Sequence, residues 1–141
     1  MTTEQTIPDR VVATDSAVQL LTKLSELHGG LMIHQSGGCC DGSAPMCYPV
    51  GEYRVGQRDV LVGEIELPEL IPDVRVWING DQFDLWKHTQ LILDVVKGRG
   101  AGFSLEAPEG VRFLSRARAF SPEENEALAA SPPLTGATAG I

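Results

Sequence analysis

Apolar residues recur every three or four positions near the start of the chain, which is the spacing of one face of an α-helix. The stripe comprises Ala17, Leu20, Leu21, Leu24 and Leu27. Ser16 with Gln19 three residues on is typical of a helix N-terminus, and the pair Gly29-Gly30 is typical of a helix end. The pattern therefore predicts an amphipathic helix that packs on a sheet.

From Leu31 the apolar spacing changes from helical to alternating. One face of a strand would carry Leu31, Ile33 and Gln35, and the other face Met32, His34 and Ser36. This predicted strand leads directly into a segment rich in glycine and cysteine.

Four further segments have strand character, because they are rich in β-branched residues or alternate in polarity. They are residues 60–65, 74–81, 91–96 and 111–119. Asn79-Gly80 lies between alternating segments, which predicts a β-hairpin there, whereas residues 84–90 fit a strand or a helix. The sum predicts an α+β fold, with the N-terminal amphipathic helix packed on a mostly antiparallel β-sheet or flattened barrel.

The two ends of the chain have weaker patterns than its middle. We expect residues 1–14 to be a flexible N-terminal segment and residues 15–120 to form a single α+β domain. Residues 121–141 consist largely of Ala, Ser, Pro, Gly, Thr and Glu, a composition that predicts a flexible C-terminal tail. A short helix after Pro122 is compatible with this composition.

Length and charge narrow the class of protein. The chain has 141 residues and a net charge of -8. A chain of this length buries roughly 68% of its unfolded surface, so it needs no disulfide or metal merely to form a core. The acidic balance disfavours nucleic acid as a partner. No apolar run is long enough to span a membrane and residues 1–10 have no signal-peptide pattern, so we expect a cytoplasmic protein without a membrane partner.

All three cysteines lie within nine residues, at Cys39, Cys40 and Cys47. Closely spaced thiolates repel one another unless a cation neutralises them, and a divalent metal ion does this. We therefore expect a metal site with these thiolates as ligands and His34, on the preceding strand, as the fourth. Zinc or iron are the first candidates, ahead of an iron-sulphur cluster. Four ligands would make the site structural or a carrier, whereas three would leave an open position for chemistry.

Two other interpretations of the same segment stay open. In the first, the protein is a thiol enzyme or redox protein, in which Cys39 or Cys40 attacks an electrophile with the help of His34 or His88. In the second, the segment is a structural loop on a protein-binding module. No Gly-x-Ser-x-Gly motif and no pair of carboxylates placed for acid-base catalysis is evident in the sequence.

Other polar clusters have simpler explanations. The segment 98–102 is rich in glycine but lacks a following P-loop lysine, so we interpret it as a turn. His88 with Trp86 and Lys87 is typical of a strand edge, although these residues could also line a pocket. Three arginines at alternate or near-alternate positions, Arg112, Arg116 and Arg118, indicate a solvated strand face.

The segment HQSGGCCDGSAPMC and the later run from GEIELPELIPDVRVWINGDQFDLWKHTQ to GVRFL resemble a bacterial family, domain of unknown function 779. The resemblance covers residues 16–120, and the cysteine segment is specific to it. Members are commonly encoded beside aldehyde dehydrogenases. The resemblance therefore implies a role near aldehyde or alcohol metabolism, with an aldehyde dehydrogenase as partner.

A more distant resemblance is to the A-type iron-sulphur carriers. Gly38-Cys39, the run 102–105 and Ala107-Pro108 occur here in the same order as in those proteins. The resemblance implies their fold. Those carriers have a pair of cysteines near the C-terminus, however, and this chain has none after Cys47. An antiparallel edge strand could also pair two copies in a homodimer.

Overall fold

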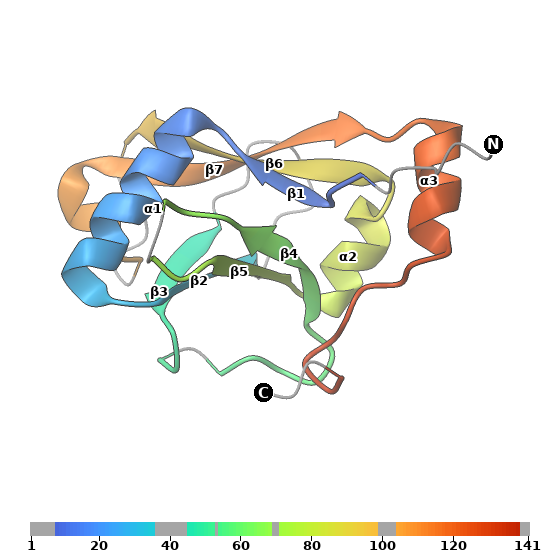
Figure 1. Ribbon diagram of the computed structural model, residues 1–141, viewed down its shortest axis with the longest axis horizontal. Coiled ribbons are helices and arrows are strands. Elements are labelled where there is room, and N and C mark those ends of the chain that lie inside the picture. Colours follow the sequence, from blue (N-terminus) through green and yellow to red (C-terminus); the bar gives the residue numbers. More distant parts are fainter. Residues whose placement is uncertain (1–7, 36–44, 53, 69–70, 99–103, 139–141) are drawn as a thin grey trace.

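Two β-sheets stacked face to face form the centre of the fold, as Figure 1 shows. The computed structural model describes residues 8–35, 45–52, 54–68, 71–98 and 104–138. Sheet A has three strands in the order β1-β6-β7, and sheet B has four in the order β3-β2-β5-β4. The strands of sheet A are β1 (Val11–Ala13), β6 (Thr89–Lys97) and β7 (Val111–Ala119). Those of sheet B are β2 (Leu31–Gln35), β3 (Met46–Pro49), β4 (Val60–Ile65) and β5 (Val74–Ile78).

Both sheets are mixed. In sheet A, β1 runs parallel to β6, and β6 is antiparallel to β7. In sheet B, β2 runs parallel to β5, whereas β3 and β4 are antiparallel to their neighbours. The predicted α+β class is confirmed, but the architecture is two mixed sheets and not a closed barrel. At one point the sheets approach closely, because a Cβ on Gly63 of β4 would lie 2.8 Å from Val11 Cγ1 of β1.

The predicted N-terminal helix is α1 (Asp15–His28), which lies across one end of the stacked sheets (Figure 1). The N-cap is Thr14 and not Ser16, because the Thr14 side chain accepts a hydrogen bond from Ala17 N at 3.2 Å. The helix buries Ala17, Leu21 and Leu24 against strands of both sheets. It therefore joins the two sheets instead of covering one.

The predicted hairpin at Asn79-Gly80 is wrong. Asn79 is the N-cap of α2 (Gly80–Trp86), and its Oδ1 accepts a hydrogen bond from Asp81 N at 2.9 Å. The helix carries the chain from β5 in sheet B to β6 in sheet A. The ambiguous stretch 84–90 is therefore divided, with the end of α2 followed by the start of β6.

The chain beyond residue 120, where we expected a flexible tail, packs on the domain as far as residue 138. It forms α3 (Pro122–Ala129) with Ser121 and Glu124 in a capping box, and then a segment over residues 134–138 that we call the strap. Leu61 N donates to Leu134 O at 2.8 Å, and Thr135 forms a β-bridge with Val60. The N-terminal segment likewise contains a strand, β1, inside the range 1–14.

The core lies between the sheets and is closed by α1 and by Trp86 of α2. A short 3₁₀ helix, η1 (Ala107–Glu109), precedes β7. Buried apolar residues of the core include Leu21, Leu24, Leu31, Ile33, Cys47, Val74, Val76, Ile78, Leu91, Leu93 and Phe113.

Candidate functional site

The cysteine segment, residues 36–47, follows β2 and runs into the start of β3. These strands are antiparallel neighbours, with Ile33 opposite Cys47 and His34 opposite Met46. Cys39 and Cys40 lie outside the described residues. Of the four predicted metal ligands, the structure therefore places His34 and Cys47.

His34 and Cys47 lie on opposite faces of sheet B. Cys47 is paired with Ile33 and belongs with it to the core between the sheets. His34 is the next residue along β2, so its side chain points to the other face. The structure does not bring these two ligands together, and one metal ion bound by both does not fit this strand register.

The backbone of Cys47 is hydrogen-bonded to a buried polar cluster. Cys47 N donates to Ser104 Oγ at 2.8 Å, and Leu105 N donates to Cys47 O at 3.0 Å. The Ser104 hydroxyl donates in turn to the carboxylate of Glu106, which also accepts from Phe113 N at 3.3 Å. Sequence reasoning missed Ser104 and Glu106, because only the fold brings them to β3.

Burial raises the pKa of the Cys47 thiol, and the nearby charge of Glu106 raises it further. The side chain is 0% exposed. Because the thiolate is the nucleophilic and metal-binding form, the protonated Cys47 is suited to neither role at neutral pH. In the folded chain Cys47 acts as a small apolar core residue.

His34 is also buried, but it faces a carboxylate. Its Nε2 lies 3.1 Å from Asp59 Oδ2, and the two side chains are 2% and 10% exposed. Asp59 Oδ2 also accepts from Gly56 N at 2.8 Å, and Gly136 N donates to Asp59 O at 2.8 Å. Asp59 therefore connects β2, the β3–β4 connection and the strap. The sequence alone did not indicate that Asp59 contacts His34, because it shows only an aspartate in the polar stretch before β4.

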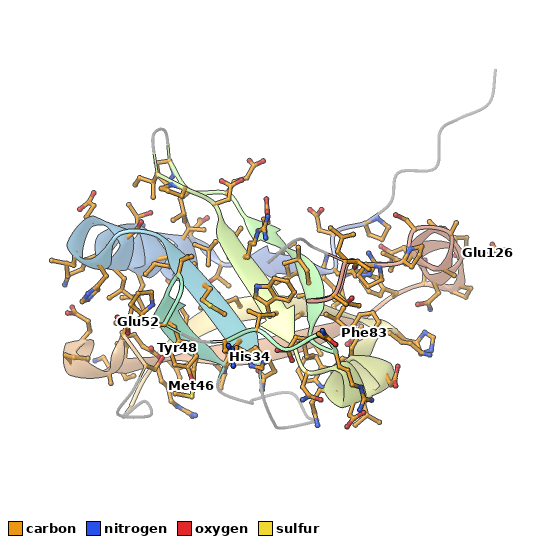
Figure 2. All side chains as sticks on the ribbon, turned by 90° about the horizontal axis from the view of Figure 1, so that it is seen from below. His34, Met46, Tyr48, Glu52, Phe83 and Glu126 are labelled. Atoms are coloured by element: carbon orange, nitrogen blue, oxygen red, sulfur yellow. The ribbon has the colours of Figure 1, made fainter. Side chains whose placement is uncertain are left out.

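The outer face of sheet B also forms the floor of a cleft. The register sets His34 beside Trp77, and Met32 beside Arg75. Figure 2 shows His34, Met46 and Tyr48 together on this side of β2 and β3. The cleft has a volume of about 880 Å³, and its roof is the β3–β4 connection and the strap. Its charged lining residues are Arg54, Arg75, Glu64 and Asp73, and its apolar ones include Leu31, Met32, Val50, Val55 and Trp77.

The arginines of β7 lie on the solvent side of sheet A. Arg116 Nε donates to Asp94 Oδ2 at 2.7 Å, and Arg118 forms a two-pronged pair with Glu124 at 3.0 and 3.1 Å. This hydrogen bonding lowers the pKa of Asp94 and holds the pKa of Glu124 at about 2. Arg116 and Arg118 are thus paired with carboxylates at the surface of the domain.

Among the described residues, no three His, Cys, Asp or Glu side chains are grouped to hold a metal ion. No helix in this part of the chain is long and apolar enough to cross a membrane. His88 is exposed, with Nδ1 3.3 Å from Asn125 Oδ1. It lies on the connection between α2 and β6, far along the chain from the cysteine segment.

Comparison with known proteins identifies the family of this chain. No curated protein matches the chain. The model of a family described as "Domain of unknown function (DUF779)" matches residues 20–119, which include β2, the cysteine segment, both sheets except β1, and α2. Since this match covers more than half of the sequence, the chain belongs to the DUF779 family.

Proposed function

We propose that this protein is a small metal-binding accessory protein, with Cys39 and Cys40 as thiolate ligands and His34 as a nitrogen ligand. The observation that carries the proposal is the buried pair of His34 and Asp59 at the end of β2, immediately before the cysteine segment. Cys47, which the sequence analysis included, is left out because it faces the opposite side of sheet B.

The pairing of His34 with Asp59 has a recognised role in metal sites. A metal-binding histidine commonly donates one ring N–H to a carboxylate, which orients the ring and makes the other nitrogen a better ligand. Here Asp59 Oδ2 lies 3.1 Å from His34 Nε2, which suits this arrangement. Asp59 is itself held by Gly56 N, which fixes the direction of the pair.

This ligand set favours a metal that accepts both sulphur and imidazole. Zinc and iron both do so, and an iron-sulphur cluster is the third candidate. Two thiolates and one histidine leave one position of a tetrahedral ion for water or another ligand. Such a position would suit a protein that delivers a metal ion or uses it as a Lewis acid.

The experiment is elemental analysis of protein purified without chelator or metal-affinity tag, with an anaerobic absorption spectrum. We expect about one zinc or iron per chain in the native protein and in Cys47→Ala. We expect loss of the metal in Cys39→Ser, in Cys40→Ser and, more weakly, in His34→Gln. Cys47→Ala is the matched control, because it removes a thiol from the same segment without changing the proposed site. Native protein that is folded and contains less than about 0.1 metal per chain would refute the proposal.

A thiol enzyme or redox protein is the second candidate, because the protonated Cys47 leaves Cys39 and Cys40 as the thiols able to react. In metal-free protein at neutral pH, this candidate predicts rapid alkylation of one of these two thiols, abolished by a single substitution. The metal proposal instead predicts that both thiols are protected by the ion and released together by a chelator.

An aldehyde dehydrogenase is the proposed partner, on the family context alone. Co-purification of a tagged chain with an aldehyde dehydrogenase from the same cell tests it. If the chain is only a binding module, a variant with all three cysteines changed to serine binds this partner as well as the native protein does. Under the metal proposal, the same variant binds more weakly.

A further inference from the structure

A second cavity lies at the other end of the fold from α1, between α2, α3 and the chain before β1. Its volume is about 300 Å³. It is lined by Arg10, by α2 and the connection after it, and by α3 and the chain that follows. We propose that this cavity binds a small organic carboxylate with an apolar body, at a site separate from the cysteine segment.

The charged groups of the cavity have one sign. Arg10 and Lys87 line it together with the imidazole of His88, and none of its described lining residues is acidic. In a chain of net charge -8 this is a local reversal of sign. Glu126 of α3 is exposed and lies on the side of that helix away from α2 (Figure 2). The charges of the lining therefore favour an anion and disfavour a cation.

Arg10 is held in place by α3. Its Nη2 donates to Leu128 O at 3.0 Å and to Ser131 O at 2.6 Å, at the C-terminal end of the helix. Within the described residues these two bonds occupy one of the three guanidinium nitrogens, so Nε and Nη1 carry N–H donors for a carboxylate. A guanidinium already fixed by the protein loses little freedom when an anion binds.

The other half of the cavity is apolar. Phe83 comes from α2, Leu128 and Ala129 from α3, and two prolines from the chain that follows. Figure 2 shows Phe83 on α2. A volume of about 300 Å³ is at the small end of the range for ligand sites, which suits a single ring or a short aliphatic chain. An inorganic anion would leave this apolar surface uncovered.

An unpaired donor lies next to the cavity. Trp86 is 5% exposed, and its Nε1 has no hydrogen-bond partner in the described part of the chain. Trp86 lines a cavity of about 10 Å³ that shares Arg10, Phe83 and Lys87 with the larger one. Buried N–H groups are seldom left unpaired, and a carboxylate oxygen or a water held by it would supply the acceptor.

The charges that line the cleft over sheet B do not favour a ligand of either sign. Its four charged lining residues are two arginines and two acids, and Arg75 Nε is already paired with Glu64 Oε1 at 3.2 Å. The cavity between α2 and α3 is smaller, yet its charges specify the sign of the ligand. For this reason we assign the carboxylate to it.

The test is titration of the full chain with benzoate, followed by the indole N–H signals in ¹H–¹⁵N NMR spectra. The chain has two tryptophans, and a Trp86→Phe variant identifies the signal of Trp86. We expect benzoate to shift that signal with a Kd of about 0.1–1 mM, while the Trp77 signal stays in place. Benzamide, the neutral analogue, and inorganic phosphate, which lacks the apolar body, should each bind at least tenfold more weakly.

Lys87→Gln should weaken benzoate binding by about fivefold to tenfold. Lys97→Gln is the matched control, since it removes the same charge from an exposed position on β6, and it should change the Kd less than twofold. Cys39→Ser/Cys40→Ser should bind benzoate as the native chain does, so loss of the metal site would leave this result intact. Equal affinity for benzoate and benzamide, an unchanged Kd in Lys87→Gln, or binding of phosphate alone would each overturn the proposal.

Discussion

Replacing Cys47 with alanine tests whether the Cys47 thiol stays protonated in the core of the folded chain. Burial, with a further contribution from Glu106, raises the pKa of this thiol in the folded chain. In the unfolded chain the same thiol ionises with an ordinary pKa of about 8.5. Above that pH the unfolded state loses a proton that the folded state keeps. The contribution of Cys47 to stability is therefore complete below about pH 8.5 and falls as the pH rises further.

The size of the effect follows from proton linkage. One thiol that ionises only in the unfolded state lowers the free energy of unfolding by about 1.4 kcal/mol per pH unit. Between pH 7.5 and pH 10 the loss sums to about 2 kcal/mol. The substitution to alanine also removes a buried sulphur atom, which costs about 1 kcal/mol at every pH in this range.

The assay compares two proteins by urea unfolding at half-unit pH steps. One is Cys39→Ser/Cys40→Ser, in which Cys47 is the remaining thiol, and the other adds Cys47→Ala. Titration of the lysines and tyrosines is common to both, so it cancels in the difference. We expect the first protein to be more stable at pH 7.5, by about 1 kcal/mol, and less stable at pH 10.

A difference that stays constant from pH 7.5 to pH 10 would refute this reasoning. It would mean that the folded thiol ionises as readily as the unfolded one. Cys47 would then be available as a thiolate, and its description as a protonated core residue would be wrong.

Three further predictions concern other parts of the fold. Asp59→Ala should lower the free energy of unfolding in urea by about 2–4 kcal/mol, because it removes the carboxylate beside His34 and Gly56 N. Asp73→Ala, at an exposed position, should change the free energy of unfolding by less than about 0.5 kcal/mol. In ¹³C NMR, Glu124 should titrate with a midpoint near its pKa of about 2, and this midpoint should rise in Arg118→Ala; a native midpoint near 4 would contradict the pairing. Because the pKa of Glu124 is lowered in the folded state, its contribution to stability is present above about pH 4.5 and is lost as the pH falls toward 2. In Gly136→Ala the added Cβ would lie 1.9 Å from Gly56 O, so the strap should detach and the amide hydrogen of Leu61 should exchange faster with solvent. Ala137→Ser, at an exposed position of the strap, is the control. Unchanged exchange in Gly136→Ala would show that the strap accommodates the added Cβ without detaching.

The periodic elements of this fold could be predicted from the sequence. The helical stripe predicted α1, and alternating or β-branched segments predicted β2, β4 and β7. A short sequence motif gave a wrong prediction where the same residues are compatible with two different local structures. Asn79-Gly80 suits a hairpin, but an asparagine side chain also caps a helix, and only the separation of β5 and β6 into different sheets distinguishes the two.

The candidate site depended on information that spacing along the chain does not carry. His34 and Cys47 are close in sequence, but the pairing of Ile33 with Cys47 sends their side chains to opposite faces. Asp59 and Glu106 reach their partners only through the fold. The packing of the strap could not be predicted either, because it is held by backbone hydrogen bonds and its composition is typical of a flexible tail.

The strand order also fixes a sequence of assembly during synthesis. All four strands of sheet B lie between residues 31 and 78, so this sheet can pair before the rest of the chain is made. β1 is made earlier but pairs with β6, and it must wait unpaired until that strand leaves the ribosome. The strap is made after both sheets, so the part of the cleft that it covers stays exposed until residues 134–138 pack over it. This interval is when the chain is most open to chaperones and to association with other unfinished chains.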